Sequence, residues 1–249
     1  QARPHASRGG LMARAAGVTG DQVNNLTLAL GSTETSPLEL TNAFATFAAE
    51  GTWAAPVIVT RVLGPDGDIR YEAPRESRAA IDPNVAWLMT SLLQSVVQTG
   101  TATKAKSLRV DVAGKTGTTN DARDAWFIGY TSELAAGVWI GRDDNLPLGR
   151  GVTGGHTAVP IWIDFMRRVV AGHPPPPFPP PRAGIVEVAV DPSTGLRATT
   201  DGRPEFFLAG TEPRELAPAA GGSSVQDVIL HGAAARDGSG TIAQPDDGF

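Results

Sequence analysis

The chain has 249 residues, of which 41% are hydrophobic, so it is long enough to bury a sizeable core as one domain or one domain with appendages. The net charge of −5 argues against a broad nucleic-acid surface, and the lack of cysteine excludes disulfides, thiol catalysis and cysteine-bound zinc. No run of about 18 apolar residues occurs that would span a bilayer. The chain begins without Met or an apolar leader, which is typical of a mature chain or a fragment.

A capping pattern predicts the first long helix. Residues 1–20 are basic and rich in Gly and Ala, which fits either a frayed end or the remains of a helix. Ser36 suits the N-cap, Pro37 suits the first helical position, and Glu39 completes a capping box. Apolar residues follow at helical spacing until Gly51, where the helix is expected to end.

A hairpin and a second helix are expected next. Residues 57–63 and 69–71 read as strands, and the Gly-Pro-Asp-Gly turn between them favours a β-hairpin. The Asp-Pro pair at 82–83 begins a helix that is expected to end with Gly100 as its C-cap. The apolar residues expected on one face of this helix are Leu88, Leu92 and Val96.

Three further strands and a third helix follow. Short polar turns separate the strand-like segments, which favours an antiparallel meander of residues 107–118, 124–131 and 134–142. The glycine-rich loop 151–157 leads through Pro160 into a helix with an expected apolar stripe of Ile161, Phe165 and Val169. Helix, sheet and helix in this order predict an α/β (α+β) fold, in which helices flank an antiparallel sheet.

A run of prolines marks a domain boundary. Proline fixes φ and removes a backbone donor, so this segment is expected to be an extended, stiff spacer rather than a peptide ligand for a partner. Beyond it, two short strands are expected to pair, and the last residues have the composition of a disordered tail. The predicted parts are a main domain at 1–172, a Pro-rich linker at 173–183, a small β extension at 184–216 and a disordered tail at 217–249.

The Gly-Lys-Thr at 114–116 allows two interpretations. A phosphate-binding loop requires a glycine five residues before Gly114, and that position holds Arg109. The residues after Thr118 suit a turn rather than a long helix, so the amide cradle for a phosphate is missing. The other interpretation is a Lys-Thr-Gly strand at the border of a cleft, where Gly117 lets a bound peptide approach the backbone closely.

Four segments carry a resemblance to a known family. The sequence AGKTGTTNDARDAWFIGYTSELAAGVWIGRDDN resembles the third-motif region of class A (bifunctional) penicillin-binding proteins, and LALGSTETSPLELTNAFATFAAEG resembles the helix before it. GVTGGHTAVPIWIDFM resembles the end of their transpeptidase domain, and DPSTGL with FLAGTEP resembles the short tail beyond. The resemblance implies a partial penicillin-binding-protein or β-lactamase-like transpeptidase fold.

Two motifs of that family are absent from the sequence. S-x-x-K, which carries the nucleophile, and S-x-N normally precede K-T-G, and neither occurs in these 249 residues. Thr101 stands three residues before Lys104, a look-alike that we attribute to chance. We therefore expect the C-terminal portion of a transpeptidase domain, cut before its nucleophile and inactive alone, with an incomplete sheet whose exposed edge is prone to aggregation. The alternative is a non-catalytic, truncated or decayed module that binds peptidoglycan or a partner.

The resemblance also assigns roles to the K-T-G strand. Lys115 would be catalytic, because its charge favours the developing alkoxide and attracts the terminal carboxylate of the substrate. Thr116 and Thr118 would hydrogen-bond that carboxylate, the backbone N–H of Thr118 would supply one oxyanion-hole donor, and Gly117 would allow close approach. Arg123 and Asp124, which follow the motif, could shape the rim of the cleft, but we expect them to pair with each other and with solvent.

Cofactors and partners follow from the same resemblance. No cofactor or metal ion is expected, and the adjacent Asp143 and Asp144 fit a turn better than a metal site. The complete protein would bind β-lactams and a peptidoglycan stem peptide ending in D-Ala-D-Ala, and it would not bind nucleic acid. It would reach the membrane only through a missing N-terminal region, and it would work in the extracytoplasmic cell envelope, on the periplasmic side of the inner membrane.

Overall fold

The computed structural model describes residues 4–20, 28, 31, 33–200 and 202–218. The chain divides into two compact units, Gln1–Ala183 and Gly184–Phe249. The tail predicted to be disordered lies outside the described residues from position 219 onward. Within the described ranges, no helix combines the length and the hydropathy that crossing a membrane requires.

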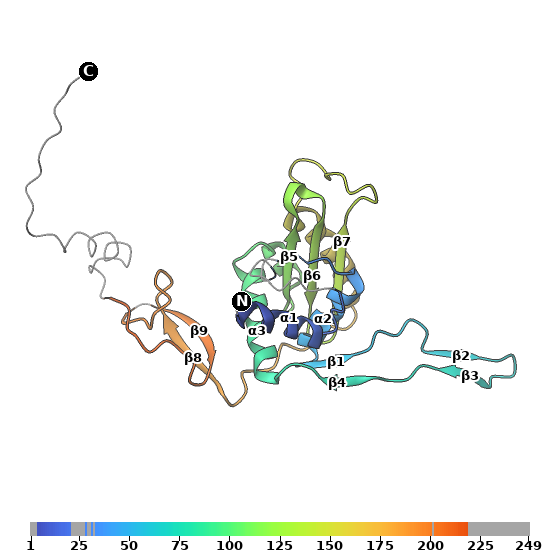
Figure 1. The fold of residues 1–249 in the computed structure, drawn as a ribbon, viewed down its shortest axis with the longest axis horizontal. Coiled ribbons are helices and arrows are strands. Elements are labelled where there is room, and N and C mark those ends of the chain that lie inside the picture. Colours follow the sequence, from blue (N-terminus) through green and yellow to red (C-terminus); the bar gives the residue numbers. More distant parts are fainter. Residues whose placement is uncertain (1–3, 21–27, 29–30, 32, 201, 219–249) are drawn as a thin grey trace, which may run out of the picture. The chain divides into compact units, whose positions relative to one another are not determined.

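The first unit contains most of the regular structure (Figure 1). Its elements in chain order are α1 (Pro4–Ala15), α2 (Pro37–Ala48), β1 (Thr52–Ala54), β2 (Arg61–Leu63), β3 (Ile69–Glu72), β4 (Ser77–Ala79), α3 (Pro83–Gln98), the 3₁₀ helix η2 (Thr103–Leu108), β5 (Ala113–Thr118), the 3₁₀ turn η3 (Asn120–Ala122), β6 (Ala125–Tyr130), β7 (Ala135–Ile140), the π-helical turn η4 (Gly154–Ala158) and α4 (Val159–Val170). The second unit contains β8 (Ile185–Val190) and β9 (Arg203–Leu208).

The capping box predicted for α2 is confirmed. The Ser36 hydroxyl accepts from the backbone N–H of Glu39 at 3.2 Å, and the Glu39 carboxylate accepts from the backbone N–H of Ser36 at 3.5 Å. The helix ends before Gly51, which has a φ of +96°. A Cβ on Gly51 would lie 2.1 Å from the carbonyl oxygen of Ile81, so only glycine fits this close approach.

The predicted antiparallel meander is confirmed as β5, β6 and β7, which pair in that order. The turn between β6 and β7 is held by the buried Thr131, whose hydroxyl accepts from the N–H groups of Glu133 and Leu134. The prediction that the first strand starts at 107 is wrong. Residues up to Leu108 belong to η2, and Arg109 has a left-handed φ of +58°, which ends that helix and separates it from the strand.

Helices cover both faces of this sheet, as the fold class predicted. On β6, Phe127 packs edge-on against Trp162 of α4, with ring centroids 5.1 Å apart. Tyr130, three residues farther along β6, packs against Phe44 of α2 at 6.3 Å. Because side chains alternate faces along a strand, these contacts place α4 on one face and α2 with α3 on the other (Figure 1).

The apolar stripes predicted on α3 and α4 differ from the sets of residues that are buried. Leu92 is 56% exposed, and Ile161 and Phe165 are each 51% exposed. The residues of α3 that are buried are Ala86, Thr90, Leu93 and Val97. Those of α4 are Val159, Trp162, Ile163 and Met166. Both helices carry apolar residues on more than one side, and packing against the sheet selects a side that spacing alone does not identify.

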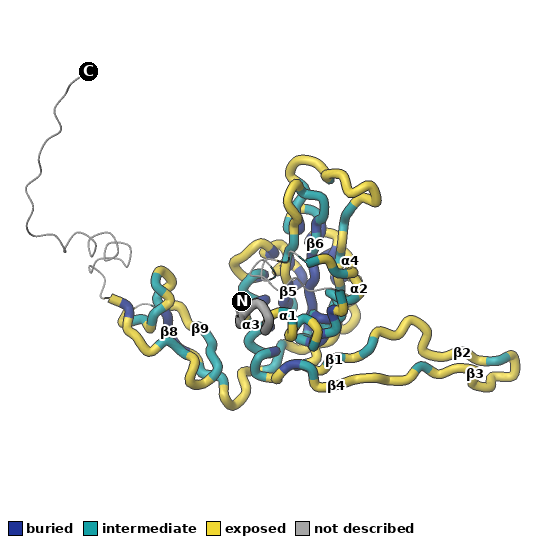
Figure 2. Tube along the Cα trace, viewed as in Figure 1, coloured by how far each residue is buried: buried dark blue, intermediate teal, exposed yellow. Residues whose placement is uncertain are grey.

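The predicted hairpin is confirmed and forms the end of a longer arm. β2 pairs antiparallel with β3, and closer to the helices β1 pairs antiparallel with β4, a pairing that the sequence did not indicate (Figure 1). Every residue of β2 and β3 is exposed (Figure 2). The outer part of the arm, β2 and β3, therefore contributes no buried residue to the cores on either side of the meander.

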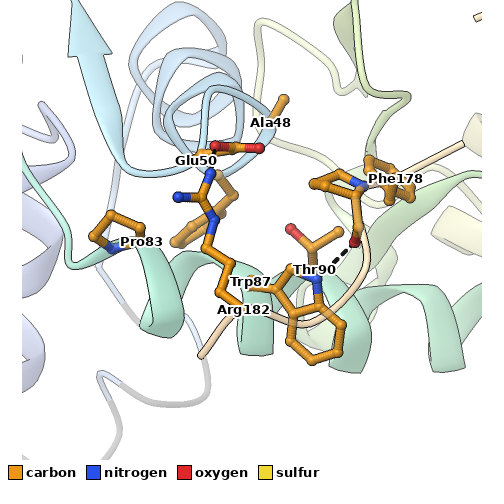
Figure 3. A pocket seen from close by; sticks show the side chains of 9 residues that line it. Ala48, Glu50, Pro83, Trp87, Thr90, Phe178 and Arg182 are labelled. Atoms are coloured by element: carbon orange, nitrogen blue, oxygen red, sulfur yellow. Dashed lines mark hydrogen bonds and ion pairs between the residues drawn. The ribbon is translucent and has the colours of Figure 1, made fainter. Parts of the chain in front are cut away.

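The Pro-rich segment packs along the first unit. Its backbone carbonyls at Pro176 and Pro179 accept hydrogen bonds from the Ser132 hydroxyl and the indole N–H of Trp87, at 2.6 and 2.8 Å. The Phe178 ring lies edge-on to Tyr130, with centroids 5.7 Å apart. Farther along, Arg182 forms an ion pair with Glu50. Figure 3 shows Trp87, Phe178, Arg182 and Glu50 among the side chains around a cavity. The cavity is lined by Phe47, Ala48, Glu50, Pro83, Trp87, Thr90, Phe178, Pro179 and Arg182.

In the second unit, β8 and β9 pair antiparallel, which confirms the two predicted strands. The turn after β8 is organised by Asp191, whose carboxylate accepts from the backbone N–H groups of Ser193 and Thr194, each at 2.9 Å. These contacts, with the Ser193 hydroxyl as the largest cause, hold the pKa of Asp191 below its ordinary value.

Candidate functional site

The four site residues predicted from the sequence, at positions 115–118, lie on β5, which is an edge strand of the three-stranded sheet (Figure 1). β6 pairs with β5 along its length, from Ala113 opposite Tyr130 to Thr118 opposite Ala125. In the described part of the chain, no strand pairs with the other side of β5. Such an edge can accept an extended peptide as a further strand.

The first two residues of β5 are buried and the other four reach the surface. Ala113 and Gly114 are buried, whereas Lys115 and Thr118 are exposed and the two residues between them are half-buried. The Lys115 ammonium donates to the carbonyl oxygen of Thr116 at 2.8 Å. An ammonium has three N–H donors, so this contact leaves donors for an approaching anion.

The Thr116 hydroxyl has a partner from another part of the chain. Its Oγ1 lies 2.6 Å from Oγ1 of Thr101, in the segment between α3 and η2. Either hydroxyl can be the donor. The exposed Thr101 is the look-alike residue that sequence reasoning set aside, and the structure gives it a contact with the predicted site.

The Thr118 hydroxyl is held from a third segment. Its Oγ1 accepts from the backbone N–H of Gly154, the first residue of η4, at 3.1 Å. The opening N–H groups of a helix have no partner within it, so Thr118 satisfies one of them. The sequence predicts a glycine-rich loop here, whereas residues 154–158 form a helical turn that continues into α4.

Two adjacent glycines make this contact possible. A Cβ on Gly154 would lie 2.3 Å from the carbonyl oxygen of Trp126 and 2.7 Å from that of Gly117. A Cβ on Gly155 would lie 2.8 Å from the carbonyl oxygen of Thr101. These distances exclude a side chain, so the segment lies directly against β5, β6 and the Thr101 loop. The Gly-Gly pair was the available sequence signal for this close approach.

The turn that follows β5 is anchored by Asp124. Its backbone N–H donates to the Thr119 hydroxyl at 2.8 Å, and its carboxylate accepts from the indole N–H of Trp139 on β7, also at 2.8 Å. The expected pairing of Arg123 with Asp124 is therefore wrong. Arg123 instead donates to the carbonyl oxygen of Asn145 at 3.0 Å. Asp124 fixes the end of the K-T-G strand to the third strand of the sheet.

The acidic pair at 143–144 forms the predicted turn. The Arg142 guanidinium makes two hydrogen bonds to the Asp144 carboxylate, at 2.6 and 2.8 Å, and holds the pKa of that carboxyl below its ordinary value. Among the residues that the structure describes, no group of three or more His, Cys, Asp or Glu side chains is arranged to hold a metal ion.

The position of Lys115 within a strand also argues against a phosphate loop. In such a loop the lysine opens a helix, whose N–H groups point at the phosphate. Here Lys115 lies in the middle of β5, and only the three-residue turn η3 follows before β6. The cavity in Figure 3 contains none of residues 115–118 in its lining, so the candidate site is the strand edge rather than that cavity.

Comparisons with known proteins agree on one family. Residues 7–145 match the family model described as the penicillin binding protein transpeptidase domain. Penicillin-binding protein 1A of Aquifex aeolicus is 38% identical over 188 residues, which cover 75% of this chain and 26% of that protein. Penicillin-binding protein 1A of Neisseria cinerea is 41% identical over 154 residues, which cover 59% of this chain and 19% of that protein. The chain thus spans a minor part of either relative.

Solved structures show the same fold. Penicillin-binding protein 1A of Haemophilus influenzae has a TM-score of 0.74 at 27% identity, over 82% of this chain and 37% of that chain. PonA1 of Mycobacterium tuberculosis has a TM-score of 0.58 at 25% identity, over 68% of this chain and 51% of that chain. The same protein has also been solved in complex with penicillin V. The likeness confirms the predicted mixture of helices and antiparallel sheet.

Proposed function

This chain belongs to the penicillin-binding protein transpeptidase family, and from that premise we propose that it is the K-T-G-bearing segment of a peptidoglycan D,D-transpeptidase. One observation carries the proposal. The edge strand β5 carries Lys115, Thr116 and Thr118. Segments from elsewhere in the chain form hydrogen bonds with the hydroxyls of the two threonines. This is the arrangement that recognition of an extended peptide with a terminal carboxylate requires.

The reaction is acyl transfer to a serine that lies outside these 249 residues. The serine oxygen forms an ester bond with the carbonyl carbon of the penultimate D-Ala, and the amide C–N bond breaks. The terminal D-Ala leaves as the free amine and takes a proton. During attack the carbonyl oxygen becomes negative, and the backbone N–H of Thr118 supplies one of the two donors that stabilise it.

Lys115 contributes charge to the same step. Its ammonium stabilises the serine alkoxide as it develops and attracts the carboxylate of the terminal D-Ala. The hydroxyls of Thr116 and Thr118 bind that carboxylate, and Gly117, without a Cβ, leaves room for the substrate backbone. A β-lactam presents a carboxylate and a reactive carbonyl to the same groups, so it acylates the same serine.

The peptidoglycan substrate determines where the parent protein works. Stem peptides are cross-linked outside the cytoplasm, so the complete protein acts at the extracytoplasmic face of the inner membrane. Because the serine is not among these residues, the 249-residue chain by itself is not acylated. The alternative, a decayed module that binds peptidoglycan without turnover, applies if the coding DNA directly upstream encodes no S-x-x-K.

Labelling with a fluorescent penicillin tests the proposal. The complete protein is expected to form a covalent adduct, and the isolated chain is expected to form none. Lys115→Ala in the complete protein should slow adduct formation by about 10²-fold, the usual effect of removing a group that stabilises charge in the transition state. The exposed Lys104→Ala is the matched control and should label at the parent rate. An adduct on any serine of these 249 residues, or normal labelling of Lys115→Ala, would refute the assignment.

A further inference from the structure

The direction of the Thr118 hydrogen bond determines where its hydroxyl proton is available. A backbone N–H is a donor only, so Oγ1 of Thr118 uses a lone pair to accept from Gly154. The hydroxyl proton is not used in this bond. It remains to be donated to another acceptor, and the exposed position of Thr118 allows that acceptor to be a ligand.

The same reasoning extends to Thr116. Its Oγ1 and that of Thr101 are 2.6 Å apart, a normal distance for a hydrogen bond between hydroxyls. When Thr101 donates, Thr116 accepts and its own proton becomes available. Thr116 and Thr118 are two residues apart on one strand, so their side chains leave β5 on the same face.

The two supporting segments also contact each other. The carbonyl oxygen of Thr101 lies so close to Gly155 that a Cβ there would be 2.8 Å away. The partners of the two site hydroxyls therefore belong to one packed layer against β5. This layer contains the loop after α3 and the first residues of η4.

We propose that Thr101 and the backbone N–H of Gly154 are positioning groups that turn the hydroxyls of Thr116 and Thr118 into donors for one substrate carboxylate. A carboxylate accepts hydrogen bonds and donates none, so it is bound best by hydroxyls whose lone pairs are already occupied. Lys115, the preceding residue of β5, leaves the strand on the other face by the same alternation, and its ammonium adds positive charge to this edge of the sheet. The proposal rests on the transpeptidase function proposed above and adds Thr101 and Gly154 to the site.

The test compares two β-lactams on the complete protein, one penicillin with its free carboxylate and the methyl ester of the same penicillin. Thr101→Val keeps the shape of the side chain and removes its hydroxyl. The acylation rate with the free carboxylate is expected to fall about tenfold, the scale of one hydrogen bond to a charged group. With the methyl ester, the acylation rate of Thr101→Val should differ from that of the parent protein by less than about twofold, because the ester has no charged carboxylate to accept the hydrogen bond.

Three further variants separate positioning from a structural effect. Thr101→Ser retains a hydroxyl and should restore the rate with the free carboxylate. The exposed Thr103→Val makes the same chemical change two residues away and should leave both rates unchanged. In a Thr116→Val background, Thr101→Val should add no further loss, because it acts through the Thr116 hydroxyl.

The outcomes distinguish this proposal from the function on which it rests. Equal losses with both compounds would show a structural role for Thr101 and overturn the proposal, as would an unchanged rate or additive losses in the double variant. If the parent protein is acylated by neither compound, the transpeptidase function itself is wrong and the positioning role is wrong with it. If Thr101→Val folds poorly, Thr101→Ser decides the question. An acylation rate of Thr101→Ser below that of the parent protein, measured with the free carboxylate, would then overturn the proposal.

Discussion

The Pro-rich segment provides the sharpest test of the fold, because sequence and structure suggest different behaviour for it. The run of prolines predicts a spacer, whereas the structure packs Phe178 against Tyr130 and bonds the neighbouring Pro179 carbonyl to Trp87. Phe178 is half-buried. If the packing persists in solution, Phe178→Ala should destabilise the chain measurably.

The expected magnitude follows from the contact. A fully buried Phe→Ala change costs about 3–5 kcal/mol, and a half-buried ring with one edge-on aromatic partner should cost about 2 kcal/mol. For a chain of this size, that corresponds to a fall in melting temperature of about 4–8 °C. Phe165 on α4 is more exposed than Phe178, at 51%, so Phe165→Ala is the matched control and should cost clearly less than Phe178→Ala.

Urea unfolding of residues 1–249, followed by tryptophan fluorescence, measures both variants. Trp87 reports directly on the segment, because its indole N–H donates to the Pro179 carbonyl oxygen. The expected result is a lower midpoint for Phe178→Ala and an unchanged slope. If Phe178→Ala and Phe165→Ala are indistinguishable, the segment is a free spacer in solution and the packing argument is refuted.

Three other outcomes can be measured with single variants. Burial raises the pKa of the Tyr130 hydroxyl above its ordinary value of 10.0, so the folded state favours the neutral form. The free energy of unfolding should therefore be constant below about pH 10 and decrease above it. In thermal melts, the melting temperature of Tyr130→Phe should decrease less above about pH 10 than that of the parent protein. Gly154→Ala should slow penicillin acylation of the complete protein by about tenfold or more, because the added Cβ displaces η4 from the strand that binds the substrate. Gly172→Ala is the control and should not change the rate, since a Cβ there meets nothing within 4 Å. Asp124→Ala should cost about 1 kcal/mol in urea unfolding, and the exposed Asp143→Ala should cost almost nothing.

Local signals in the sequence predicted the parts of the fold that depend on near neighbours. The capping box at Ser36 joins residues three apart, and the meander depends on turns of a few residues. The start of β5 was placed too early because alternation continues through residues 107–112, while the left-handed φ of Arg109 ends η2 there. The sequence does not predict a positive φ at Arg109, because arginine is not among the residue types that favour this conformation.

The candidate site likewise contains a part that the sequence predicts and a part that depends on contacts between distant residues. Lys115–Thr118 is a contiguous motif and could be found from the sequence. Thr101 lies 15 residues from Thr116, and Gly154 lies 36 residues from Thr118. The glycine pair at 154–155 signals a close approach, but the sequence does not identify which residues it approaches, since the contact depends on how η4 and the loop after α3 pack against β5.

The apolar stripe predicted on α4 and the buried side of that helix are two different faces. Ile161, Phe165 and Val169 recur every four residues and are all exposed, while the neighbouring side of the helix, with Trp162 and Met166, is buried. The same exposed part of α4 carries Asp164, which forms ion pairs with Arg167 and Arg168. Spacing therefore identified a genuine apolar stripe on α4, but packing against the sheet determines which residues of the helix are buried.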